Sequence, residues 1–218
     1  MTFVREFSMK KVANLPSCPY FALMTKADEL KKHLRPGRVY RRQDLAVWSN
    51  SVDRHLKALL SDGTLTKVAA GLYLYPKQTA FGEAPADDVT LVGSFLKDRR
   101  FLLASPNLYN SLGVGTTQLY DKTIVYNLKR HGNFWLDGRP FDFRVKPFPR
   151  RLSKEFLLVD LVNNVDRLAE SRYEVLARVK ERAPSFDVPR LERAARDYGN
   201  LRTKKFFSEA LKAELDAG

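Results

Sequence analysis

The sequence of 218 residues predicts an α+β protein with helices and a small hairpin first, a middle α/β unit with antiparallel strands, and helices at the end. Three observations predict this order. Apolar residues recur at helical spacing up to residue 60, alternate with period two within residues 65–75 and 123–145, and return to helical spacing from residue 152. With 44% hydrophobic residues the chain can form a real core, so disorder of the whole chain is excluded.

Two stretches that contain proline, near Pro76 and near Pro147, divide the sequence. We expect an N-terminal extension over residues 1–24, a first domain over 25–78, and a second domain over 79–218 that ends in a helical segment. The formal net charge is +13, of which residues 1–78 carry +8, residues 79–150 carry +3 and residues 151–218 carry +2. The first third is therefore the part expected to associate with nucleic acid or another polyanion.

Two helices joined by a short element are predicted in the first domain. Leu30 and Leu34 lie one helical turn apart, and Pro36 and Gly37 end that helix. The short element covers residues 39–48, and the capping residues at 49–51 begin the next helix, which ends at Asp62 and Gly63. The expected buried residues are Leu45, Ala46 and Trp48 in the short element, and Val52, Leu56, Leu59 and Leu60 in the helix.

A hairpin follows, with strands over residues 65–69 and 72–75 and a turn at 69–71. Helix, turn, helix and hairpin in this order are typical of the winged helix-turn-helix. In that fold the second helix of the motif enters a DNA major groove and the hairpin touches the neighbouring backbone. The sequence thus predicts that residues 25–78 bind double-stranded DNA.

The predicted DNA contacts differ in what each side chain can recognise. Arg54 has the donors for a bidentate contact with guanine, and Asn50 has the donor and acceptor for adenine. The hydroxyls of Ser49 and Ser51, with the N–H groups at the helix start, suit a phosphate. His55 lies beside a core leucine, where packing is as good an interpretation as binding. Sequence-independent phosphate contacts are expected from Arg41, Arg42, Lys57 and Lys67.

The second domain is predicted from turn residues and alternation. Residues 76–86 are expected to be an extended link, Asp87 and Asp88 to begin a helix, residues 101–104 to form a strand, and Ser105 to begin another helix. Strands are expected at 123–128, 134–136 and 141–145, with a tight turn at Asp137 and Gly138. From residue 152 onward the pattern is helical, with breaks near 183 and 188.

We find no motif for catalysis, a metal or a cofactor. His33, His55 and His131 lack a partner at metal-ligand spacing, and the phosphate-binding loop of nucleotide-binding enzymes is missing. The single cysteine, Cys18, excludes an internal disulfide framework and fits a reducing compartment. No apolar run approaches the roughly 18 residues of a membrane-spanning helix, and the start lacks the pattern of a signal peptide. We therefore expect a cytoplasmic, non-enzymatic protein.

The order of these parts resembles one family. The run SVDRHLKALLSDGTL at residues 51–65 and the run VAAGLY at residues 68–73 resemble the recognition helix and wing of AbiEi-like antitoxins of the type IV toxin-antitoxin systems. The segments that continue the resemblance are Pro76 and Lys77, Phe81 and Gly82, Pro85, and the predicted helix from Ser105 to Gly113 ahead of the strands.

The resemblance implies a transcriptional repressor of its own operon that binds inverted repeats in the promoter. It also implies a C-terminal domain that counteracts a nucleotidyltransferase toxin encoded beside it. The DNA-binding residues implied by the resemblance are Ser51, Arg54, His55, Lys57, Lys67 and Gly71. No antitoxic residue is implied, because the C-terminal helices match in pattern and not in a diagnostic motif.

Two alternatives remain open besides a winged-helix regulator unconnected to a toxin. In one, the second domain is an enzyme that processes nucleic acid and is targeted by the winged helix. Such an enzyme needs acidic or nucleophilic residues in one cleft, for which Asp121, Asp137 and Asp142 are the candidates. In the other, the winged helix binds a protein partner, and binding to DNA would then lack a steep salt dependence.

Overall fold

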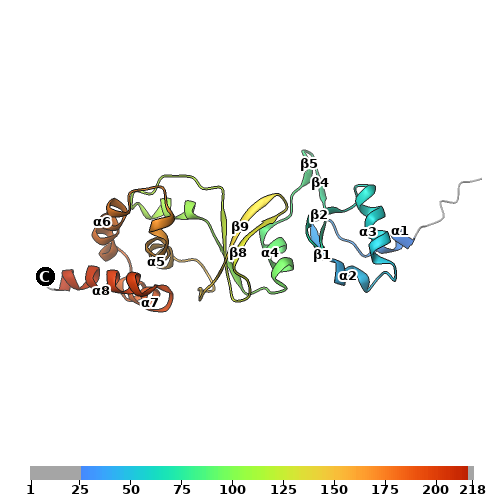
Figure 1. Ribbon diagram of the computed structural model, residues 1–218. Coiled ribbons are helices and arrows are strands. Elements are labelled where there is room, and N and C mark those ends of the chain that lie inside the picture. The colour runs from blue at the N-terminus through green and yellow to red at the C-terminus, as the bar shows by residue number, and fades with distance from the viewer. Residues whose placement is uncertain (1–25, 216–218) are drawn as a thin grey trace, which may run out of the picture.

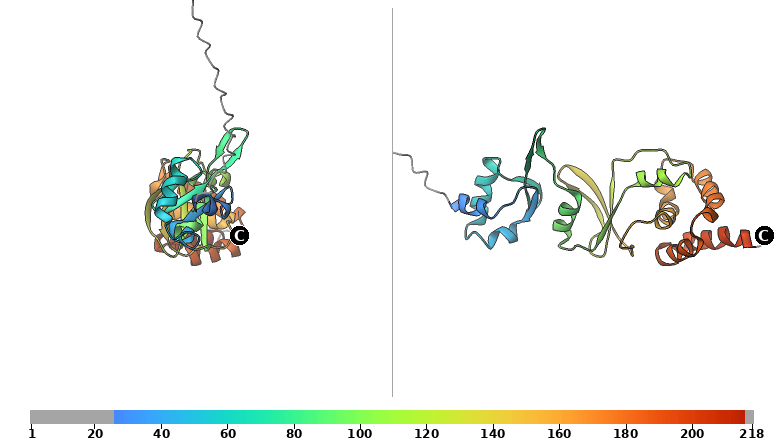
Figure 2. Two further views of the ribbon diagram at one scale, coloured as in Figure 1. Left: turned by 90° about the vertical axis from the view of Figure 1, so that its right-hand side faces the viewer. Right: turned by 180° about the vertical axis from the view of Figure 1, so that it is seen from behind.

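The computed structural model describes residues 26–215, and its side chains from residue 27 to 212. The expected N-terminal extension at 1–24 and Cys18 lie outside the described residues. Three parts follow one another along an elongated molecule: an N-terminal unit, a middle unit with a four-stranded sheet, and C-terminal helices (Figures 1 and 2). The mixed α+β class and the C-terminal helices agree with the prediction from the sequence.

The N-terminal unit, residues 26–75, contains three helices and a three-stranded sheet. Its elements are α1 (Lys26–Lys32), β1 (Arg38–Arg41), α2 (Arg42–Ala46), α3 (Val52–Ser61), β2 (Thr66–Ala69) and β3 (Leu72–Tyr75). The antiparallel sheet has the order β1-β3-β2. The helices pack on one face of this sheet around Leu30, Leu34, Tyr40, Leu45, Val52, Leu56, Leu59 and Leu65.

The short element before α3 differs from its prediction. Its first residues belong to strand β1, the helix covers only Arg42–Ala46, and the last two residues form a turn. Leu45 is buried as expected, but Ala46 is exposed, because a helix of little more than one turn directs only one position inward. Trp48 is exposed as well and lies beyond the end of α2. Trp48 stacks instead on His33, with ring centroids 5.0 Å apart.

The second face of the N-terminal sheet packs on the middle unit. Because side chains alternate along a strand, Val39, Leu72 and Leu74 point away from the helices, where they join Leu91 and Phe141 in a second core. The N–H of Asp137 also donates to the carbonyl of Val68 at 2.8 Å. The domain boundary expected after residue 78 is therefore not a break in packing. Helix α4 (Asp88–Leu96) lies between the two sheets (Figure 1).

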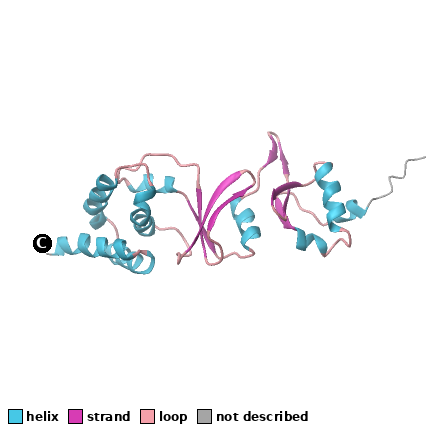
Figure 3. Ribbon diagram, viewed as in Figure 1, coloured by secondary structure: helices cyan, strands magenta, loops and turns pink. Residues whose placement is uncertain are grey.

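The segment expected to be an extended link contains a second hairpin. Strands β4 (Lys77–Thr79) and β5 (Gly82–Ala84) pair antiparallel, and this hairpin projects from the side of the molecule (Figure 3). Gly82 has a φ of 104°, which a glycine adopts without steric cost, so the tight turn is possible there. Phe81 beside it is fully exposed.

The middle sheet contains β6 (Phe101–Ala104), β7 (Thr123–Asn127), β8 (Gly132–Leu136) and β9 (Arg139–Val145), in the order β6-β7-β9-β8. The expected turn at Asp137 and Gly138 is present, with positive φ at both residues. The prediction of antiparallel strands is wrong for one pair, because β7 and β9 are parallel. The chain reverses after β7 and again after β8. Strand β9 therefore regains the direction of β7 and lies beside it, while β8 takes the outer edge.

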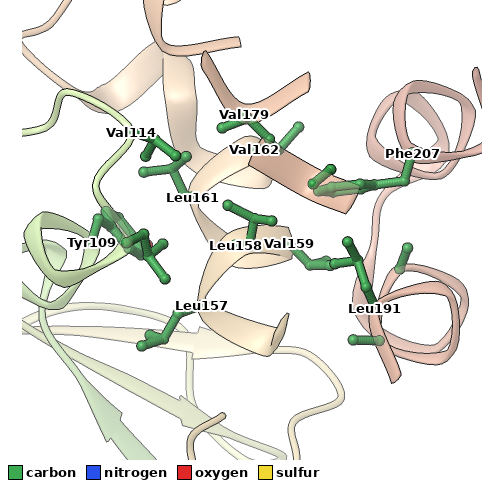
Figure 4. Close-up of a cluster of buried hydrophobic side chains, with 14 of the residues drawn as sticks. Tyr109, Val114, Leu157, Leu158, Val159, Leu161, Val162, Val179, Leu191 and Phe207 are labelled. Carbon is green, nitrogen blue, oxygen red and sulfur yellow. The ribbon is translucent and has the colours of Figure 1, made fainter. Parts of the chain in front are cut away.

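The C-terminal part packs on the other face of this sheet. Its elements are η1 (Pro106–Leu112), which precedes β7 in the chain, α5 (Lys154–Asn164), η2 (Val165–Arg167), α6 (Arg172–Arg182), η3 (Ala183–Ser185), α7 (Val188–Tyr198) and α8 (Leu201–Leu215). Helix α5 lies in the centre, and its side chains contact η1, α6, α7 and α8 around Tyr109, Val179, Leu191 and Phe207 (Figure 4). Within residues 26–215, no helix is long and apolar enough to cross a membrane.

Candidate nucleic-acid interface

Helix α3 presents a polar face to solvent. Val52, Leu56 and Leu59 are buried against the N-terminal core, and their helical spacing leaves the opposite side of α3 uncovered. Arg54 and Lys57 occupy that side, and Asn50 lies four residues before Arg54, ahead of the helix. All three residues are exposed. Among the described residues, neither Arg54 nor Lys57 forms an ion pair with an acidic side chain. These charges are therefore available to a ligand that approaches α3.

The first turn of α3 lacks a side-chain cap. Ser51 occupies the N-cap position, but its hydroxyl makes no capping hydrogen bond. The first N–H groups of a helix have no acceptor within the helix, and a phosphate oxygen suits them. The exposed hydroxyl of Ser51 and these N–H groups therefore form a polar start to the same surface.

Ser49 and His55, by contrast, belong to the interior. The Ser49 hydroxyl and His55 Nδ1 share a hydrogen bond of 2.7 Å, and the two residues are only 9% and 7% exposed. The same hydroxyl accepts from the N–H of Ser51 at 3.3 Å. A buried pair that satisfies its own hydrogen bonds presents little to a ligand, so this position argues against Ser49 and His55 as DNA contacts. They position the turn into α3 instead.

Arg42 is already paired with α3. Its guanidinium donates two hydrogen bonds, of 2.7 and 2.6 Å, to the carboxylate of Asp53 in the first turn. These hydrogen bonds raise the pKa of Arg42 and lower the pKa of Asp53. Both side chains are largely exposed, and exposed ion pairs contribute little stability. The pair is therefore able to open when a phosphate competes for Arg42.

The other predicted contacts lie beside α2 and the first hairpin. Arg41 donates to the carboxylate of Asp44 at 2.9 Å and is partly buried, so much of its role is to fix the start of α2. Gly71 has a φ of 71° in the hairpin turn, and its carbonyl accepts from the N–H of Arg42 at 2.9 Å. Lys67 on β2 is exposed. The hairpin turn is thus tied to the beginning of α2.

Two cations that the sequence analysis missed lie near this turn. Lys97, just after α4, and Arg130, before β8, line a pocket of about 310 Å³ together with Arg41, Arg42 and Gly71. They are 33 positions apart in the part of the chain with little net charge, so neither spacing nor composition pointed to them. The folded chain alone brings them beside the N-terminal unit.

The acidic residues considered for catalysis belong to separate groups. Asp137 accepts from the N–H of Ala86 at 3.1 Å. Asp142 accepts from Arg144 at 2.7 Å and lies 3.2 Å from Lys122, whereas Asp121 is exposed. Burial would raise the pKa of Asp142, but the hydrogen bonds and charges of Arg144 and Lys122 hold it below its usual value. No group of three potential metal ligands occurs among the described residues.

A buried polar network lies between the middle sheet and α5. Asp160 is fully buried and accepts from the hydroxyls of Tyr109 and Tyr126 and from Lys146 Nζ, at 2.7 to 2.8 Å. Burial and the nearby carboxylate raise the pKa of both tyrosines. Asn164 completes the network with a bond of 2.7 Å to the Asp160 carbonyl. Because Asp160 has no exposed surface, the network stabilises the layer between sheet and helices.

Comparisons with known protein families, with curated proteins and with solved structures found no match to this chain. The resemblance to AbiEi-like antitoxins therefore stays a prediction that depends on the residues named above.

Proposed function

We propose that the protein binds double-stranded DNA and that residues 26–75 are a winged helix-turn-helix. Its recognition helix would be α3, and its wing the hairpin of β2 and β3. The order α1, β1, α2, α3, β2, β3 and the sheet order β1-β3-β2 support this assignment. The hairpin turn, the start of α2 and the start of α3 lie together, as the Arg42 contacts with Gly71 and Asp53 require.

The observation that carries the proposal is the exposed row of Asn50, Arg54 and Lys57 over a buried apolar stripe. A helix fits a DNA major groove, where an arginine pairs with guanine and an asparagine with adenine. Lys57 supplies charge without base specificity. Lys67, Ser51 and the free N–H groups at the start of α3 add phosphate contacts around this row.

We further propose that the protein is an antitoxin and autorepressor, which rests on the resemblance to AbiEi-like proteins. In this role it would bind inverted repeats in its own promoter and counteract a nucleotidyltransferase encoded beside it, without catalysis of its own. Co-expression of that neighbouring gene tests this part. Growth should stop without the present chain and resume with it, and growth arrest that persists would contradict the antitoxin role.

DNA binding is tested by titrating the full chain against a duplex from its own upstream region and a scrambled duplex. Arg54→Ala should cost about 1 to 3 kcal/mol on the specific duplex and much less on the scrambled one, because a base contact is lost. Lys57→Ala should weaken both duplexes alike and flatten the salt dependence by about one unit of slope. Lys180→Ala on α6 removes an exposed lysine elsewhere and serves as the control.

Two outcomes would contradict the proposal. If Arg54→Ala leaves the preference for the upstream duplex unchanged, α3 does not contact bases. If the wild-type affinity hardly changes between low and moderate salt, few phosphates are neutralised, and a protein partner becomes the better interpretation of the exposed face.

A further inference from the structure

A basic pocket lies between the N-terminal unit and the end of α4 and is lined by both. Its volume is about 310 Å³, and four cationic side chains line it: Arg41, Arg42, Lys97 and Arg130. The remaining lining residues are neutral, so no carboxylate belongs to the lining. A concave site of this charge selects an anion, since field lines from several like charges concentrate in a cleft.

The uncompensated charge in this pocket comes from the middle unit. Arg41 and Arg42 have acidic partners in Asp44 and Asp53. Lys97 Nζ donates only to the neutral amide oxygen of Gln43, at 3.0 Å, and Arg130 lies over the Phe95 ring with its Cζ 4.5 Å from the centroid. Neither forms an ion pair with another described residue, so both keep their full charge for a ligand.

The backbone holds Lys97 in place. Lys97 ends α4 in the left-handed conformation with a φ of 54°, where glycine would be less strained. Its carbonyl accepts from Lys129 Nζ at 3.1 Å, and the same ammonium lies 3.1 Å from the carboxylate of Asp98. Lys129 is therefore neutralised by Asp98, whereas Lys97 is directed to Gln43 and the pocket.

The pocket adjoins the proposed DNA-reading surface. Arg42 belongs to both, because it lines the pocket while its guanidinium binds Asp53 in the first turn of α3. The hairpin turn also lines the pocket through Ala70 and Gly71. Lys97 and Arg130 therefore lie beside the hairpin turn and beside the arginine that contacts the start of α3.

We propose that Lys97 and Arg130 bind a backbone phosphate of the same duplex that α3 reads, so that the middle unit extends the DNA contact. This inference rests on the proposed DNA binding. The middle unit is packed on the N-terminal sheet through a shared core, which fixes the two cations relative to α3 without a flexible linker. They hold the position of the duplex and contribute no base preference.

The test removes both charges and keeps the stems, with Lys97→Gln and Arg130→Gln in one variant. The matched control is Lys180→Gln with Arg193→Gln, which removes the same two charges from exposed positions on α6 and α7. On a duplex with several flanking base pairs, the first variant should lower the salt slope by about 1, because one phosphate contact is lost, and weaken binding about tenfold at moderate salt. The preference for the specific over the scrambled duplex should stay unchanged.

A second arm shortens the duplex until it spans only the bases read by α3. The pocket variant and the wild type should then bind alike, because the flanking phosphate is missing. If the pocket variant behaves like the control on the long duplex, the inference is wrong, while a loss of preference in Arg54→Ala still supports the proposed function. Absence of salt-dependent binding in the wild type would overturn both.

A third arm distinguishes a small phosphate ligand from the DNA backbone. Inorganic phosphate and a nucleoside monophosphate are added at constant ionic strength, and the melting temperature is measured. If either stabilises the wild type but not the pocket variant, while the two bind DNA equally, the pocket takes a small phosphate compound and the inference is overturned. No such difference in melting temperature, with weaker DNA binding by the variant, supports the backbone phosphate.

Discussion

Helices α3 and α5 are nearly equal in length and use their charged residues in opposite ways. In α3, one apolar stripe is buried and the remaining surface carries Arg54 and Lys57 in solvent. In α5, side chains are buried in every direction from Phe156 to Val162. A helix with one covered face keeps its charges for partners, and a helix covered on all faces must satisfy its charges inside the protein.

Asp160 shows the consequence for α5. Each oxygen of its carboxylate accepts at least two hydrogen bonds, from the two tyrosines and Lys146. The carboxylate thereby joins β7, η1 and the end of β9 to the central helix. In α3, the acidic Asp53 has one exposed arginine partner. The difference teaches that burial decides whether a charge in this protein serves stability or binding.

The largest expected effect is therefore in α5. Asp160→Ala should lower the free energy of unfolding by about 3 to 5 kcal/mol, because it leaves Lys146 and two tyrosine hydroxyls without their acceptor. Asp160→Asn keeps one acceptor oxygen for these donors and should cost less. Urea unfolding followed by circular dichroism measures both.

The control is Asp166→Ala, just after α5, where an exposed carboxylate pairs with Arg172 and Arg202. Exposed pairs contribute little, so this loss should be small. If Asp160→Ala costs no more than Asp166→Ala, burial does not decide how much a carboxylate contributes to the stability of this protein.

A smaller effect is expected from the buried pair within the N-terminal unit. His55→Ala and Ser49→Ala should each lower stability, and their double-mutant cycle should give a coupling of about 1 kcal/mol for the shared hydrogen bond. DNA affinity, measured well below the melting temperature, should stay close to wild type because neither side chain reaches the surface.

The opposite result, lower DNA affinity with unchanged stability, would place His55 among the residues that contact DNA. A loss of specific affinity as large as that of Arg54→Ala, without a loss of stability, would contradict the buried position and support the contact that the sequence alone predicts for His55.

Local patterns in the sequence predicted much of the N-terminal unit. The stripe of Val52, Leu56 and Leu59 fixes both the existence of α3 and its exposed face, because helical spacing alone decides which side chains point together. The turn at Asp137 and Gly138 was equally predictable, since both residues tolerate positive φ. The same spacing could not decide whether His55, at the border of the stripe, packs or binds.

Features that depend on distant parts of the chain were not predictable in this way. The parallel pairing of β7 with β9 arises because β9, and not β8, lies beside β7. The alternation of apolar and polar residues along the strands is the same for either arrangement, so it cannot predict which one forms. Lys97 and Arg130 become neighbours of Arg42 only because Val39 and Leu72 pack against the middle unit. A single cation in a loop belongs to no repeating pattern, so the sequence does not show that two such residues become neighbours.

The smallest expected effect is a gain in DNA affinity when the ion pair between Arg42 and Asp53 is removed. Asp53→Asn removes a negative charge from the first turn of α3 and releases Arg42 from its ion pair. Both changes favour phosphate, so affinity for any duplex should rise about two- to fivefold and the salt slope should steepen by up to about one unit.

Glu174→Gln is the matched control, because it removes an exposed acidic residue from the first turn of another helix, α6. It should leave DNA binding unchanged. A gain confined to the specific duplex would mean that residue 53 contacts a base, since a released phosphate contact acts on all sequences alike. Unchanged or weaker binding by Asp53→Asn would mean that the pair with Asp53 holds Arg42 in its binding position, and the ion pair would then belong to the binding surface itself.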